Sequence, residues 1–109
     1  MLPSPTNILR LVINLDRSPE RLESISKQLS AQGLSFQRIP ARDGRKLSPE
    51  ELSRLEAPYD APEKFVFRKA LWPTEIACFL SHATCWEKLV KSNREWGLIM
   101  EDDIVLSPR

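Results

Sequence analysis

The stretch ILRLVINLDRSPER, residues 8–21, decides the fold of this chain. Its first part is rich in leucine, valine and isoleucine with little alternation, which favours a strand covered on both faces. Ser18 can cap a helix and Pro19 suits a first helical turn, so we expect a helix from this point. Apolar residues recur at helical spacing as far as Leu29, and Gly33 is a candidate C-terminal cap.

A second short strand is expected at residues 36–39, ended by Pro40. A strand–helix–strand unit predicts two parallel strands joined by a right-handed crossover. The apolar residues 96–100 predict a third buried strand. The fold class that follows is α/β, with a mostly parallel open sheet flanked by helices.

Two further helices are expected between the second and third strands. Ser48 and Glu51 fit a capping box that starts a short helix ending near Leu55. Residues 57–62 suggest a surface loop, and residues 65–67 suggest a small strand. The longest helix should be capped by Thr74 and end near Ser92. Its expected apolar stripe consists of Ile76, Phe79, Leu80, Ala83, Trp86 and Val90.

Length and composition fit one compact soluble domain over residues 1–109, or the N-terminal piece of a larger one. A formal net charge of +1 gives no basis for a strongly cationic nucleic-acid binder. No apolar run approaches the roughly 20 residues of a membrane-spanning helix, and the first residues lack the blocks of a secretory signal. We therefore expect a cytoplasmic protein, with peripheral contact to the inner membrane as an option.

Cys78 and Cys85 should lie on the longest helix, about 10.5 Å apart along its axis. A disulfide needs Cα atoms within about 7 Å, so we expect free thiols, both buried as small apolar groups. His82 lies between them on the same helical face. A zinc site made of all three is a poor interpretation, because the cysteines are too far apart to bind one ion and a fourth ligand is not evident. On local chemistry alone, His82 is a packing residue.

The acidic run Glu101, Asp102 and Asp103 directly follows the third strand. Adjacent carboxylates beside a core repel one another and lose hydration, and a divalent cation relieves both costs. In an extended chain Glu101 and Asp103 point to one side and Asp102 to the other. The alternative is a solvated strand end or a set of surface ion pairs.

Fold logic favours a binding site here, because ligands of open parallel sheets bind at the carboxyl ends of the strands, where strand order reverses. If the third strand lies beside the first and opposite the second, the acidic run meets Asn14 and Asp16 there. Arg17 and Arg21 offer guanidinium groups suited to phosphate, and Asp43 can accept hydrogen bonds from a base or ribose. The alternatives are a solvated helix start for the arginines and a turn-forming role for Asp43.

Four blocks of the sequence carry a family resemblance. They are VINLDRSPER at 12–21, RIPARDG at 38–44, TEIACFLSH at 74–82 and LIMEDD at 98–103. In this order they resemble the family 25 glycosyltransferases, which include bacterial lipooligosaccharide galactosyltransferases and collagen galactosyltransferases. Each block is weak alone, but four in register over nearly the whole chain are highly specific.

The resemblance implies a GT-A-like (Rossmann-like) fold and inverting transfer of a sugar, commonly galactose, from a UDP donor to a lipooligosaccharide or other glycan. It also implies Mn²⁺ (or Mg²⁺) at the acidic run and a role for His82 toward the donor or a carboxylate. Thr74 and Ala77 stand where the family tends to have glycine. The chain stops just after the acidic run, so it looks truncated, and the acceptor site and catalytic base are expected elsewhere.

Other function classes remain open on the sequence. The chain could be a truncated nucleotide-sugar-binding module without turnover, or a metal-dependent phosphohydrolase, since carboxylates at strand ends serve both. A structural interaction protein is a further option. A small sheet would leave an exposed edge, which favours a homo-oligomer.

Overall fold

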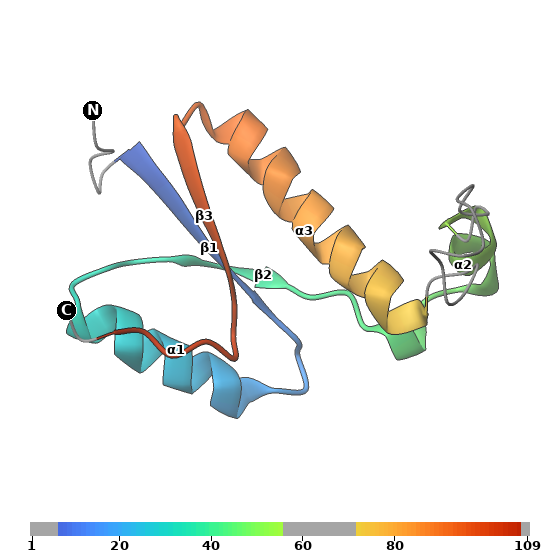
Figure 1. Ribbon diagram of the computed structural model, residues 1–109, viewed down its shortest axis with the longest axis horizontal. Coiled ribbons are helices and arrows are strands. Elements are labelled where there is room, and N and C mark those ends of the chain that lie inside the picture. Colours follow the sequence, from blue (N-terminus) through green and yellow to red (C-terminus); the bar gives the residue numbers. More distant parts are fainter. Residues whose placement is uncertain (1–6, 56–71, 108–109) are drawn as a thin grey trace, which may run out of the picture.

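A computed structural model describes residues 7–55 and 72–107, which form a small parallel sheet flanked by helices (Figure 1). The strands are β1 (Ile8–Asn14), β2 (Gln37–Pro40) and β3 (Trp96–Glu101). Their order is β2-β1-β3, and both pairings of β1 are parallel. The α/β, Rossmann-like prediction is therefore confirmed.

β1 is the central strand, and its carboxyl half is the most deeply buried part of the sheet. Residues 11–14 are all buried, as expected for a strand covered on both faces. β3 lies beside β1 on the side opposite β2, with Val12 in register with Met100 and Asn14 with Pro40. The carboxyl ends of the three strands therefore meet at a point where strand order reverses.

Helix α1 (Pro19–Ala31) covers one face of this sheet (Figure 1). Ile25 and Leu29 pack there against Val12 and Met100. The helix ends in a Schellman motif: Gly33 has φ +69°, its N–H donates to the Ser30 carbonyl at 2.9 Å, and the Leu34 N–H donates to the Leu29 carbonyl at 2.9 Å.

The predicted cap of α1 needs a correction. Ser18 does occupy the N-cap position and Pro19 the first turn, but the Ser18 hydroxyl forms no capping bond with the described residues. Its backbone carbonyl is used instead, as acceptor for the Asn14 side-chain amide at 3.0 Å. The start of α1 is thus tied to the tip of β1 through the backbone.

Helix α3 (Pro73–Ser92) covers the opposite face, where Cys85 packs against Leu11, Ile13 and Ile39. It begins before the predicted cap: Trp72, not Thr74, is the N-cap residue. The Glu75 carboxylate accepts a hydrogen bond from the Trp72 N–H at 2.9 Å, which satisfies one of the donors at the helix start.

The predicted apolar stripe of α3 is wrong for three of its six residues, while Leu80 and Ala83 are partly buried. Ile76 is buried, but Phe79, Trp86 and Val90 are exposed, with 79% of Val90 accessible. The buried residues of the helix are Ile76, Ala77, Ser81 and Cys85. Three of these four side chains are small, so the buried face of α3 differs from the face of large apolar residues that the spacing indicates.

β3 was predicted as a fully buried strand, and this is also wrong for most of its length. Trp96 is 49% exposed and Leu98 47% exposed, whereas Met100 is buried. The cause is topology, since β2 and β3 are the outer strands of the described sheet. Self-association through such an edge stays a prediction.

The segment after β2 contains a 3-10 turn, η2 (Gly44–Lys46), and helix α2 (Pro49–Leu55). The predicted capping box is present in part, because the Glu51 N–H donates to the Ser48 hydroxyl at 3.1 Å. A Cβ on Gly44 would lie 2.9 Å from backbone atoms of Pro73 and Thr74. Only glycine permits this approach of η2 to the start of α3.

Some predictions lie outside the described residues, namely the loop at 57–62 and the small strand at 65–67. Among the described helices, none is both long and apolar enough to cross a membrane.

Candidate functional site

A cavity of about 350 Å³ opens at the carboxyl ends of the strands. Its lining comes from the start of α1, the segment around η2, the first three turns of α3 and the end of β3. Most of the predicted site residues line it: Arg17, Arg21, Asp43, His82, Glu101, Asp102 and Asp103. The strand-end logic therefore brings these side chains to one place.

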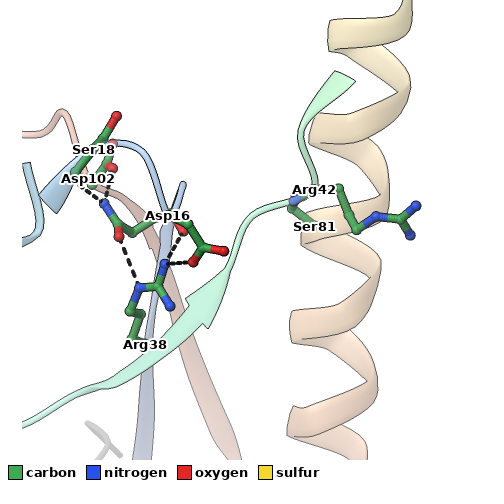
Figure 2. A network of polar contacts seen from close by, with 7 residues as sticks. Asp16, Ser18, Arg38, Arg42, Ser81 and Asp102 are labelled. Atoms are coloured by element: carbon green, nitrogen blue, oxygen red, sulfur yellow. Dashed lines mark hydrogen bonds and ion pairs between the residues drawn. The ribbon is translucent and has the colours of Figure 1, made fainter. Parts of the chain in front are cut away.

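Asn14 is the centre of a hydrogen-bond network behind this cavity (Figure 2). Its side-chain amide donates to the Asp102 carboxylate at 2.7 Å and to the Ser18 carbonyl at 3.0 Å. Its side-chain oxygen accepts from the Arg38 guanidinium at 2.9 Å. Asn14 is 2% exposed and outside the cavity lining, so it positions the neighbours that face the cavity.

Asp102 is held on the α1 side of β3. Besides the Asn14 amide, the Arg21 guanidinium lies 3.8 Å from its carboxylate. The Asp102 side chain is only 11% exposed, whereas Arg21 is 57% exposed and can change partner at low cost. The Asp102 carboxylate is therefore held in place, whereas the Arg21 side chain beside it can reorient.

A second ion pair joins the segment between β1 and α1 to the start of η2. Arg17 donates to the Asp43 carboxylate at 2.8 Å, and that carboxylate also accepts from the Arg45 N–H at 3.0 Å. Asp43 thus caps η2, as the turn-forming alternative predicts, and it also faces the cavity. Asp43 can therefore both form the turn and accept hydrogen bonds from a bound ligand.

Asp16 does not line this cavity but a neighbouring hollow, which shares Arg17 and Asp43 with it. Its carboxylate accepts from Arg38 at 2.6 Å. Arg38 was missed by the sequence reasoning, although it belongs to the second family-like block. A signal was available, since parallel register places Arg38 beside the tip of β1.

Glu101 points to the other side of β3, toward α3. One of its carboxylate oxygens lies 3.7 Å from His82 Nε2 and 3.7 Å from Cys78 Sγ. The predicted alternation is confirmed for these two acids, because Met100 packs on the α1 face, Glu101 faces α3 and Asp102 faces the α1 side again. Asp103 follows in a turn, is exposed and lines the cavity.

The two cysteines, both in the described part of the chain, are free thiols as predicted. Cys85 is buried as expected, but Cys78 is exposed, which corrects that prediction. Partial burial, followed by the negative charge and hydrogen bond of Glu101, raises the pKa of the Cys78 thiol. Burial also raises the pKa of Cys85, against a smaller opposing effect of Lys88.

The segment between β2 and α2 is fixed to α3 by residues that the sequence reasoning did not single out. The buried Ser81 hydroxyl accepts the Arg42 N–H at 2.9 Å and donates to the Ala77 carbonyl at 2.9 Å. The Arg42 side chain pairs with Glu51, and this hydrogen bond is the main cause that lowers the pKa of that carboxyl. These contacts hold one wall of the cavity in place.

Comparison with known proteins agrees with the sequence resemblance. The family described as glycosyltransferase family 25 (LPS biosynthesis protein) matches residues 7–109. A "Glycosyltransferase 25 family member" of Aedes aegypti is 38% identical over 98 residues, which cover 89% of this chain and 16% of that protein.

Two further relatives have more specific names. "Procollagen galactosyltransferase 2" of Homo sapiens is 29% identical over 101 residues, covering 85% of this chain and 15% of its own length. "Probable inactive glycosyltransferase 25 family member 3" of Bos taurus is 30% identical, covering 85% and 16%. The chain thus spans about a sixth of the length of these relatives. With the family match over nearly its full length, the chain belongs to glycosyltransferase family 25.

Proposed function

We propose that this chain is the nucleotide-sugar-binding part of a glycosyltransferase that transfers galactose from UDP-galactose to a glycan acceptor, with inversion. Family membership and the name of the human galactosyltransferase relative support the reaction class. The family description, which mentions LPS biosynthesis, supports a lipooligosaccharide acceptor. The observation that carries the proposal is a single cavity at the strand ends that is lined by both arginines and acids.

Arg17 and Arg21 are the proposed diphosphate ligands. Arg17 directly precedes the N-cap of α1 and Arg21 lies in its first turn, both line the cavity, and about half of each side chain is exposed. Each is now paired with a carboxylate, so a bound diphosphate would exchange an Asp43 or Asp102 contact for phosphate oxygens. Guanidinium groups at a helix start suit this exchange, since backbone N–H groups there also favour anions.

Asp43 is the proposed contact for the nucleoside. It is fixed by the Arg45 N–H and is 14% exposed, which leaves little freedom for its carboxylate. A carboxylate so held accepts hydrogen bonds from ribose hydroxyls or a base N–H. His82, on the opposite wall of the cavity, is the proposed contact for the donor on the α3 side.

Glu101, Asp102 and Asp103 are the proposed ligands of Mn²⁺ or Mg²⁺. All three carboxylates line the same cavity and offer the hard oxygen atoms that these cations prefer. Glu101 faces α3 whereas Asp102 faces Asn14 and Arg21, so the side chains must reorient to hold one cation together. When bound, such a cation supplies charge neutralisation at the diphosphate as the sugar–phosphate bond breaks. The chain's own part is to fix Asp102 through Asn14, so that one carboxylate is pre-positioned.

Calorimetric titration of UDP and UDP-galactose, with and without Mn²⁺, tests this proposal. We expect Mn²⁺ to strengthen UDP binding by about tenfold or more. Asp103→Asn should abolish that gain without changing stability, because Asp103 is exposed. Glu23→Gln is the matched control, since within the described residues the exposed Glu23 pairs with Lys27, one turn along α1, at 3.1 Å.

Donor turnover separates the remaining function classes. Galactose transfer to an acceptor sugar supports the full proposal, and metal-dependent binding without transfer supports a binding module, as the bovine relative's name would suggest. Phosphate release from UDP-galactose without an acceptor would indicate a phosphohydrolase. Absence of UDP binding with every divalent cation would overturn the proposal.

A further inference from the structure

A second group of potential metal ligands lies on the α3 side of the cavity. Cys78 and His82 are one helical turn apart on α3, and Glu101 reaches them from the end of β3. One ligand atom of each lies within 4.8 Å of the others. This group differs from the zinc set considered in the sequence analysis, because Glu101 takes the place of Cys85.

The spacing of these atoms is close to that of a tetrahedral site. Zinc bonds of about 2.0 Å to nitrogen or oxygen and 2.3 Å to sulfur place neighbouring ligand atoms about 3.3–3.6 Å apart. The Glu101 oxygen is 3.7 Å from Cys78 Sγ and 3.7 Å from His82 Nε2. A contraction of a few tenths of an ångström brings both pairs into bonding geometry.

The surroundings support such a contraction. Cys78 and Glu101 are exposed, so their side chains can adjust, while His82 is only 30% exposed. The Trp86 ring packs beside the imidazole, with ring centroids 6.4 Å apart. His82 is therefore the restrained ligand, and the two flexible ligands can close around an ion next to it.

The donor types determine which cation fits. A thiolate and an imidazole select Zn²⁺ or a similar thiophilic ion over Mn²⁺ and Mg²⁺, which prefer oxygen. Three protein ligands leave a fourth position for water or a bound molecule, and all three residues line the cavity. The open position would therefore face the same space as the proposed donor site.

We propose that Cys78, His82 and Glu101 form a three-ligand site for Zn²⁺ or another thiophilic divalent cation. Binding forms bonds to sulfur, nitrogen and oxygen, and the thiol proton passes to solvent. The site shares Glu101 with the proposed Mn²⁺ ligands but does not involve Asp102 or Asp103. Its test uses neither nucleotide nor sugar, so either proposal can fail while the other stands.

Cobalt substitution tests the site directly. Co²⁺ added to the 109-residue chain should give a near-ultraviolet thiolate-to-metal charge-transfer band that Zn²⁺ abolishes. The band should disappear in Cys78→Ser and persist in Cys85→Ala, which removes the other thiol of the same helix. Zn²⁺ affinity, measured by competition with a chromophoric chelator, should fall by about tenfold or more in Cys78→Ser, His82→Gln and Glu101→Gln. Circular dichroism of each variant checks that the fold is retained.

Alkylation of the unmodified chain gives an answer that does not depend on any variant. Zn²⁺ should protect Cys78 from iodoacetamide, as located by peptide mapping, and Mg²⁺ at the same concentration should not. A charge-transfer band that survives Cys78→Ser, or the lack of any band or protection in the unmodified chain, would overturn the site.

Discussion

The two helices that cover the sheet use opposite means of packing. α1 inserts large side chains, Ile25 and Leu29, between itself and the sheet. α3 packs Cys85 against the other face, its further buried residues are Ile76, Ala77 and Ser81, and it exposes Phe79, Trp86 and Val90. The comparison teaches that an amphipathic pattern identifies the buried face only where large apolar residues do the packing.

The two sides of the sheet also differ at the carboxyl ends of the strands. On the α1 side, β3 presents Asp102 to the Asn14 amide and Arg21, an arrangement of oxygen and nitrogen groups for anions and hard cations. On the α3 side it presents Glu101 to a thiol and an imidazole. Two adjacent acids, separated by one step of strand alternation, therefore belong to chemically different environments.

The largest expected effect is on the α1 side of the core. Ile25→Ala removes a fully buried side chain and should lower the free energy of unfolding by about 3 kcal/mol, measured by urea denaturation. Cys85→Ala, on the α3 side, removes only a sulfur atom and should cost about 1 kcal/mol. Equal losses in the two variants would contradict the difference in packing.

The sequence predicted the α1 side well for this reason. Leu22, Ile25 and Leu29 have the regular spacing of a buried face, and Gly33 ends the helix as expected. The strand–helix–strand pattern also predicted the parallel pairing of β1 with β2 correctly. These features follow from local pattern and chirality, both of which are visible in one sequence.

The α3 side could not be predicted from the same pattern. Phe79, Trp86 and Val90 share a helical face that looks like a core face, but all three are exposed. The exposure of Trp96 and Leu98 likewise depends on β3 being an outer strand. The spacing of apolar residues does not show how a helix is seated on a sheet or which strand lies at its edge.

The candidate site was predicted in outline but not in its contacts. The strand-end rule placed Arg17, Arg21, Asp43 and the acidic run 101–103 together, and all of them line one cavity, whereas Asn14 and Asp16 do not. His82 also lines it, as the family resemblance implied. The strand-end rule did not reveal that Asn14 is buried behind the cavity or that Arg38 is its partner. Those roles depend on side-chain orientation at a crowded junction, which spacing alone does not give.

The next largest effect should come from the network behind the cavity. Asn14→Leu keeps a similar volume but leaves Asp102 and Arg38 without their amide partner in a partly buried setting. We expect the free energy of unfolding to fall by about 2 kcal/mol, measured by urea denaturation. Ser18→Ala is the control, because only the backbone of Ser18 joins the network, and it should cost less than about 0.5 kcal/mol. A larger loss of unfolding free energy in Ser18→Ala would indicate that the Ser18 hydroxyl does cap α1, as the sequence predicted.

A smaller effect should appear in the chemistry of the α3 side. The pKa of Cys78 is raised first by partial burial and then by the charge of Glu101. Glu101→Gln should lower this pKa and increase the thiolate fraction, so alkylation near pH 8 in the presence of a chelator should be faster. Cys85 is the internal control, since its pKa responds to burial and Lys88 rather than to Glu101.

The sign of the pH effect on stability follows from the same group. A thiol with a raised pKa in the folded state binds its proton more tightly there than in the unfolded chain. Its contribution is complete below the unfolded pKa and is lost as the pH rises through the folded pKa. An unchanged alkylation rate of Cys78 in Glu101→Gln would show that the two groups do not interact in solution.

The smallest effect is expected on the outer face of α3. Val90 is 79% exposed, so Val90→Ser removes little buried area and should change the free energy of unfolding by less than about 0.5 kcal/mol. The measurement is urea denaturation at several protein concentrations. A loss near that of Ile25→Ala, or one that grows with concentration, would mean that this face is covered, and that large apolar residues pack on both sides of α3.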